Sequence, residues 1–94
     1  MTRSDLAKSL ASLSDDLSLD KIEELTKYIF SLMSDNLVGG DRIEVRGFGT
    51  FSIRHRNARI ARNPKTGETF QVEAKLAIHF KAGKELKDRL NRNI

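Results

Sequence analysis

Apolar residues in the first part of the chain repeat with the period of an α-helix. One helical face is predicted for four leucines that follow one another at spacings of four, three and four residues: Leu6, Leu10, Leu13 and Leu17. Thr2 and Asp5 have the spacing of a capping box, which marks the start of this helix. The polar run 14–16 interrupts the stripe, and we expect a turn there.

A second apolar stripe follows and predicts a longer helix. Ser18 is placed to cap this helix, and Asp20 lies in its first turn, where a negative charge is favourable. Gly39 and Gly40 are expected to end it. The stripe consists of Ile22, Leu25, Ile29, Leu32, Met33 and Leu37. We therefore expect residues 1–40 to form a hairpin of two amphipathic helices.

Alternation of apolar and polar residues, the pattern of a half-buried strand, replaces the helical period after residue 40. It is present at Ile43 and Val45 and returns at Phe51 and Ile53, beyond a glycine turn at 47–49. It returns once more near the end of the chain, at Leu76, Ile78 and Phe80. These patterns predict three antiparallel strands.

The stretch 54–69 fits neither period, and its middle carries a strong turn signal. Asn63 suits the first position of a type I turn, Pro64 fixes the second, and Gly67 can adopt the positive φ that follows. Strand-forming residues lie on both sides. We expect a long two-stranded ribbon, and because an isolated ribbon is only marginally stable, we expect it to be mobile until something binds it.

These elements predict an α+β fold in a single domain. Its parts are a helical, dimer-forming hairpin (1–40), a three-stranded sheet (41–53 and 70–81), a ribbon arm (54–69) and a short C-terminal helix (82–94). A chain of 94 residues hides only about 60% of the surface that it exposes when unfolded. We therefore expect a partner chain to complete the core.

The net charge of +4 hides an uneven distribution. Residues 1–45 carry 5 basic and 9 acidic side chains, whereas residues 46–94 carry 12 basic and 4 acidic ones. The densest stretch, 54–65, holds five positive charges and no acid. A split of this size favours a face that binds a polyanion, although a merely solvated loop remains an alternative.

The residues do not indicate an enzyme. Cysteine is absent, and His55 and His79 lie 24 positions apart in strand patterns without paired acids. We therefore expect a protein that is not an enzyme, with no metal, cofactor or small-molecule substrate. Residues 1–5 do not resemble a signal peptide and no apolar run approaches membrane length, so we expect a cytoplasmic protein without a membrane partner.

Pro64, the only proline, stands at the apex of the cationic ribbon. Arginine side chains can neutralise phosphates and enter a narrow minor groove. A rigid apolar ring at the tip can push between two base pairs, unstack them and bend the duplex. The alternative is that Pro64 only forms the turn.

Three motifs resemble the HU and integration host factor family of bacterial nucleoid proteins. The run Arg62–Glu68 is similar to the family's arm tip, Gly47–Phe51 to its first strand turn, and Phe80–Leu86 to the start of its last helix. The match spans essentially the whole chain. It implies an intertwined dimer whose two arms wrap double-stranded DNA, and roles in nucleoid organisation, recombination, replication and transcription regulation.

We expect three sets of site residues besides the intercalating Pro64. The arm should bind DNA through Arg54, Arg56, Arg59, Arg62, Asn63 and Lys65. The DNA backbone should also be contacted by Arg3, Ser4, Arg42, Lys75, Gly83 and Lys84. The dimer core should include Ile22, Leu25, Ile29, Phe30, Met33, Phe48 and Phe51.

Glu44 and Arg46 resemble a pair in the beta subunits of integration host factor, where the matching residues take part in recognising a preferred sequence. This resemblance implies a partner that is a related alpha subunit, with a second copy of the chain as the alternative. Ala61 and Ala82 stand where the family usually has glycine and proline. Two rival functions stay open: an HU-like homodimer without sequence preference, and a helical adaptor that binds another protein.

Overall fold

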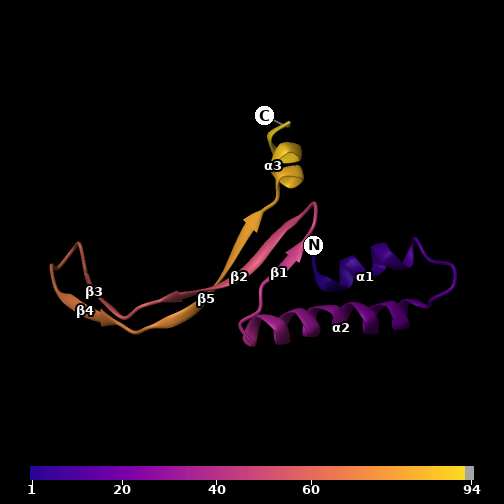
Figure 1. Cartoon of the computed structure of the whole chain (residues 1–94). Coiled ribbons are helices and arrows are strands. Elements are labelled where there is room, and N and C mark those ends of the chain that lie inside the picture. The colour runs from indigo at the N-terminus through magenta and orange to yellow at the C-terminus, as the bar shows by residue number, and fades with distance from the viewer. Residues whose placement is uncertain (93–94) are drawn as a thin grey trace. The chain divides into compact units, whose positions relative to one another are not determined.

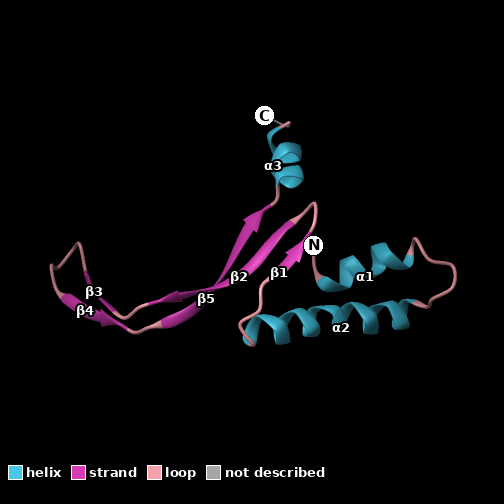
Figure 2. Ribbon diagram, viewed as in Figure 1, coloured by secondary structure: helices cyan, strands magenta, loops and turns pink. Residues whose placement is uncertain are grey.

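The computed structural model describes residues 1–92 and divides into two compact units, Met1–Gly39 and a second unit that begins at Gly40. The described residues form three helices and five strands. Two helices come first, the strands follow and a short helix comes last, as the sequence predicts, and β3 and β4 are the strands of the predicted ribbon (Figures 1 and 2). The elements are α1 (Arg3–Ala11), α2 (Leu19–Val38), β1 (Ile43–Val45), β2 (Gly49–Arg56), β3 (Arg59–Arg62), β4 (Thr69–Val72), β5 (Lys75–Ala82) and α3 (Lys84–Asn91).

The capping box predicted at the start of α1 is confirmed. The backbone N–H of Thr2 donates to Asp5 Oδ2 (2.9 Å), and the N–H of Asp5 donates to Thr2 Oγ1 (3.1 Å). The backbone and then the side chain of Thr2 hold the pKa of Asp5 below its usual value. A lowered pKa in the folded chain means that this cap stabilises the helix at neutral pH and is lost as the pH falls through that pKa.

The first leucine stripe is shorter than predicted, because α1 ends at Ala11. The Ser12 hydroxyl donates to Ser9 O (2.6 Å), and the N–H of Leu13 donates to Leu10 O (3.0 Å). The second contact joins residues three apart, so it tightens the chain and stops the α-helical ladder. Leu13 is consequently 85% exposed, and the prediction that it continues the helical face is wrong, as it is for Leu17.

Helix α2 has the predicted ends. Ser18 Oγ accepts a hydrogen bond from the N–H of Lys21 (3.2 Å), and the helix closes at Gly39, after which Gly40 has a φ of 90°. That left-handed conformation favours glycine. The hairpin buries Ala7 against Ile22 and Thr26, whose hydroxyl donates to the carbonyl of Ile22 (2.7 Å).

Strands β1, β2 and β5 form an antiparallel sheet in that spatial order. Cross-strand partners share a face, and one face of the sheet is apolar. The apolar sheet face consists of Ile43, Phe51, Ile53, His55, Leu76, Ile78 and Phe80. Phe80 anchors it, with ring centroids 4.7 Å from Phe51 and 5.4 Å from Phe48.

Two glycines around the first strand turn have different functions. Gly47 is the third residue of a turn that the N–H of Phe48 closes onto Val45 O (2.9 Å), and its φ of 84° fits a type II turn. Gly49 is buried, and a Cβ atom there would lie 2.5 Å from Phe80 Cζ and 2.6 Å from Lys81 O. Gly49 is therefore required by packing, which the sequence did not reveal.

The ribbon arm continues the pairing of β2 with β5. Arg56 lies opposite Lys75, and after a short interruption Arg59 lies opposite Val72 in the same register. The predicted boundaries differ from this arrangement, because residues 54–56 still belong to the sheet ladder and residues 69–72 pair within the arm. Figure 1 shows the arm as a curved extension of β2 and β5.

Helix α3 begins later than predicted. Ala82 extends β5 and lies opposite Gly49, and the N–H of Gly83 donates to Phe48 O (2.8 Å) before the helix starts at Lys84. This contact fixes the start of α3 to the first strand turn. The predicted helical segment ends at residues 93–94, which lie outside the described residues.

Few apolar side chains are buried in the described part of the chain. Among residues 1–92, only Ala7, Ile22 and Leu37 form a buried hydrophobic core, whereas Ile78 is 64% exposed. None of the helices described is long and apolar enough to cross a membrane. Because each unit leaves an apolar surface exposed, the fold is incomplete as a single chain.

Replacing Gly49 by alanine should destabilise the protein by about 1–3 kcal/mol, because the added methyl group overlaps Phe80 and a backbone carbonyl. Gly39→Ala is the matched control. Gly39 has a φ of −74°, and a Cβ there would lie 3.4 Å from its nearest neighbour, an ordinary contact. Chemical denaturation should show a large loss for the first variant and a change within about 0.5 kcal/mol for the second. Equal stabilities would contradict the packing role of Gly49.

Candidate nucleic-acid interface

The arm tip is a four-residue loop held by backbone hydrogen bonds. The N–H of Asn63 donates to Glu68 O (2.8 Å), and the N–H of Gly67 donates to Asn63 O (2.8 Å). Asn63 Oδ1 also accepts from the N–H of Lys65 (2.9 Å), which fixes the chain around Pro64. The predicted positive φ of Gly67 is confirmed at 76°. The loop closes at Gly67, one residue later than a simple type I turn.

The cationic side chains of the arm do not share one face. Arg59 lies opposite Val72, and Arg62 lies opposite Thr69, three positions further along β3. Because side chains alternate along a strand, the two arginines project from opposite faces of the ribbon. Both are exposed, as are Asn63, Pro64 and Lys65 at the tip. The arm can therefore present positive charge to two walls of a groove at once.

The arm has almost no core of its own. Ile60 is 78% exposed and Phe70 is 53% exposed, on opposite faces of the ribbon. Only Ala61 and Val72 are half-buried. Hydrogen bonds between β3 and β4 thus hold the arm with little help from apolar burial, and the mobility of the arm stays a prediction.

A second cationic surface covers the sheet. The polar sheet face consists of Thr50, Ser52, Arg54, Arg56, Lys75, Ala77, His79 and Lys81. It contains the predicted contacts Arg54, Arg56 and Lys75, and no acidic residue occurs on β2 or β5. Lys81 and His79 were not among the predicted contacts, although period-two alternation with Arg54 and Lys75 places them on this face.

Glu44 and Arg46, the pair predicted to give sequence selectivity, lie on different elements, because Glu44 belongs to β1 and Arg46 to the turn that follows it. Glu44 Oε2 lies 3.8 Å from Arg42 Nη2, and both side chains are 68% exposed. Arg46 lies in the strand turn, beyond the end of β1, so its side chain does not follow the alternation that would align it with Glu44. Arg46 is exposed and available to another molecule.

Two helix starts offer backbone amides. The first helical hydrogen bond of α1 runs from the N–H of Leu6 to Thr2 O, so the amides of Arg3 and Ser4 precede the ladder. In α3 the first such bond runs from Lys87 to Gly83 O, and Gly83 has no side chain to cap the helix. Both starts carry the partial positive charge of the helix dipole, which suits an anion.

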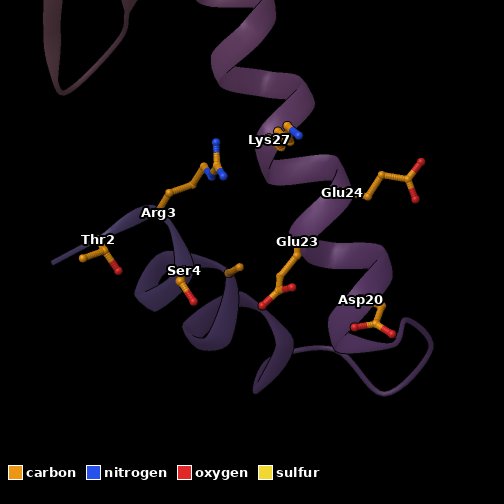
Figure 3. Close-up of a pocket in the computed structure, with 8 residues that line it drawn as sticks. Thr2, Arg3, Ser4, Asp20, Glu23, Glu24 and Lys27 are labelled. Atoms are coloured by element: carbon orange, nitrogen blue, oxygen red, sulfur yellow. The ribbon is translucent and has the colours of Figure 1, made fainter.

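A cleft of about 720 Å³ lies between the start of α1 and the first turns of α2. Its lining, drawn in Figure 3, mixes both charges: Thr2, Arg3, Ser4, Ala7, Asp20, Glu23, Glu24 and Lys27. Three carboxylates repel a phosphate from the cleft itself. A phosphate at Arg3 and Ser4 is therefore expected outside the cleft, at the helix start.

The predicted dimer-core residues fall into three groups by exposure. Ile22 is buried inside the hairpin of its own chain, so its assignment to an interface is not supported. Met33 and Phe51 are half-buried. The others remain substantially exposed: Leu25 (42%), Ile29, Phe30 and Phe48.

Comparison with known proteins accounts for this combination of arm, sheet and hairpin. The profile of the family described as "Bacterial DNA-binding protein" matches residues 1–91. The chain belongs to this family. Two members of it, integration host factor subunit beta from Teredinibacter turnerae and from Histophilus somni, are 49% and 52% identical to the chain. These alignments cover 100% and 97% of the chain and 96% and 97% of the relatives.

A solved structure of the same family has the same fold. The HU protein of Anabaena, crystallised with DNA, superposes with a TM-score of 0.80 at 27% sequence identity. The superposition covers 96% of this chain and 97% of the HU chain. This bacterial DNA-binding family thus includes both the fold and the arm described here.

In the free protein, backbone amides of β3 and β4 should exchange with solvent faster than those of β2 and β5. The physical reason is that Ile60 and Phe70 are exposed, whereas Phe51 and Phe80 pack together. Hydrogen exchange followed by NMR measures both sets in one sample. Equal protection in the arm and the sheet would show that the arm is rigid without a ligand.

Proposed function

We propose that the chain is an architectural DNA-binding protein that acts as a dimer and bends double-stranded DNA. The observation that carries this proposal is the exposed cationic ribbon with Pro64 in its tip loop. Integration host factor and HU are the standard examples of minor-groove binders of this kind, so the mechanism comes with the family.

The arm is suited to lie in a minor groove. Arg59 and Arg62 project from opposite faces of the ribbon, so each can approach a different wall of the groove. A narrow groove has an enhanced negative potential that attracts arginine. Arg56 extends this charge toward the sheet, and Lys65 extends it to the tip.

Pro64 acts as the wedge. Its ring is exposed, and the Asn63–Lys65 contact holds the loop that presents it. Proline has no backbone N–H that would lose a partner between two base pairs. Unstacking one step costs a few kcal/mol, which the additional phosphate contacts of the bent duplex offset.

Dimer formation completes the core. Leu25, Ile29 and Phe30 expose apolar surface on α2, and Ile78 exposes more on the sheet. A partner with the same fold can cover these faces and adds a second arm. The similar proteins are named as beta subunits, which favours a related alpha subunit as the partner over a second copy of this chain.

The body of the dimer holds the flanking DNA. Phosphates would bind the amides of Arg3 and Ser4 on α1 and of Gly83 and Lys84 at α3. Lys75 and Arg54 extend the contact along the polar sheet face. Arg46 would reach a groove edge from the strand turn and contribute selectivity, and Glu44 and Arg42 would approach the duplex from the region of β1.

The cellular role follows from this binding mode. The protein would act in the bacterial cytoplasm on the nucleoid, where bent DNA supports recombination, replication and transcription regulation. Its function would be binding, because the arm and the sheet face carry exposed cations that can contact phosphates.

An HU-like protein with little sequence preference is the second candidate. The contact between Glu44 and Arg42 favours it, because Glu44 does not orient Arg46 in the free chain. Competition between a duplex that carries a preferred site and a random duplex separates the two candidates. Equal affinities would select the HU-like function.

Pro64→Ala should reduce the bend of a short duplex much more than it reduces binding, because the cationic arm remains while the wedge is lost. Energy transfer between fluorophores at the two ends of the duplex reports the bend. Thr66→Ser, which keeps the hydroxyl that accepts a hydrogen bond from the N–H of Glu68 (3.3 Å), is the control in the same loop and should bend DNA as the unchanged protein does. An unchanged bend in Pro64→Ala would show that Pro64 does not act as the wedge.

Arg62→Ala should weaken binding and flatten its salt dependence. With about ten phosphates neutralised per dimer, log affinity should fall with log salt at a slope of about −9, and losing two arginines from a homodimer should make it less steep by about 2. Lys21→Ala is the control, since Lys21 Nζ lies 3.7 Å from Glu24 Oε2 on α2, away from the arm residues in sequence. Filter binding or fluorescence anisotropy gives both slopes; identical slopes would exclude Arg62 from the phosphate contacts.

Gel retardation at low salt distinguishes the proposed DNA-binding protein from a helical adaptor. The proposed protein should shift duplex DNA, because its cations lie on exposed faces. A chain that leaves the duplex unshifted would be an adaptor with a solvated basic half.

A further inference from the structure

The polar sheet face carries one side chain with a chemistry that the other contacts lack. His79 of β5 lies directly opposite Ser52 of β2 and is half-buried. Histidine is the side chain whose charge ordinarily changes between pH 5 and pH 8. Because His79 lies on a cationic face, it is placed to bind an anion.

The charged neighbours of His79 are all positive. On β2, the residues diagonal to it are Thr50 and Arg54, and on β5 the flanking residues of the same face are Ala77 and Lys81. Strand β5 is at the edge of the sheet, so β2 is the one strand beside it. Among the described residues of the three sheet strands, the acid on this face is Glu44 of β1. Glu44 lies opposite Thr50, and its carboxylate contacts Arg42.

A phosphate is the ligand that this arrangement fits. Arg54 and Lys81 flank His79 and attract an anion to the face, and the Ser52 hydroxyl can donate a further hydrogen bond. A phosphate against the imidazole favours its protonated form, because a charge-assisted hydrogen bond then forms. Binding of an anion at this position is thereby coupled to uptake of a proton.

We propose that His79 contacts a DNA phosphate and takes up a proton when the duplex binds, so that affinity rises as the pH falls. This inference rests on the proposed function, since it requires a duplex across the sheet. It adds a contact that the arm and the helix starts do not supply.

His55 provides an internal control. It lies on β2 opposite Leu76, on the apolar sheet face, with Ile53 and Ile78 as the adjacent pair. A histidine on that face does not meet the same phosphate. The two histidines of the chain therefore give opposite expectations for the same measurement.

The test measures the affinity of the dimer for a short duplex at about pH 5.5 and about pH 7, at constant ionic strength. The unchanged protein should bind about tenfold more tightly at the lower pH, because two histidines per homodimer gain a charge-assisted contact. In His79→Gln this difference should shrink to about twofold or less, whereas His55→Gln should retain it. Calorimetry in buffers of different ionisation enthalpy should show proton uptake for the unchanged protein and for His55→Gln, but not for His79→Gln.

His79→Lys separates charge from folding. A permanent positive charge at this position should give tight binding at both pH values, with no proton uptake. The proposal is overturned if the unchanged protein binds equally at both pH values, if His79→Gln keeps the full difference, or if His79→Lys binds no better than His79→Gln at neutral pH. If the unchanged protein fails to bind duplex at either pH, the proposed function itself is wrong.

Discussion

The fold depends on apolar surface that one chain cannot bury. Helix α2 and the sheet each have an apolar face, yet the buried hydrophobic core of the described residues is limited to Ala7, Ile22 and Leu37. A surface of this kind is stable in water only when a second chain covers it. The need for a partner has a functional consequence, because every dimer carries two arms and can hold a duplex from two sides.

The arm, in contrast, has almost no apolar core to stabilise it. Its pairing continues the ladder of β2 and β5, so a rigid sheet supports it at one end. Beyond Arg56 the ribbon no longer packs on anything, and Ile60 and Phe70 remain exposed. A groove that receives the ribbon supplies the contacts that a core would otherwise provide. The lack of apolar packing makes the arm only marginally stable on its own, and it also leaves the arm available for binding.

Local chemistry made much of this architecture predictable. The capping box at Thr2, the cap at Ser18 and the positive φ of Gly67 depend on neighbouring residues, and the structure has all three. The arm motif and the order of elements likewise identified the family. Contacts that depend on strand register were harder to predict. Alternation shows that a strand has two faces, but it does not show which residue of the neighbouring strand lies opposite each position.

Where the sequence failed, a competing contact decided the outcome. The hydroxyl of Ser12 and a tightened turn ended α1 before Leu13, although the leucine period continues. Glu44 of β1 lies 3.8 Å from Arg42, which precedes the strand, while Arg46 lies in the turn that follows the strand. The requirement for Gly49 comes from Phe80, which is distant in sequence and becomes a neighbour only through the register of β2 and β5.

Native mass measurement of the purified chain, alone, with a related alpha chain and with a short duplex, tests the need for a partner most directly. We expect the folded species to be a dimer, of two copies or with the alpha chain, and one dimer to bind one duplex. A folded monomer that binds DNA one to one would contradict it, because the exposed faces of α2 and the sheet would then need no cover.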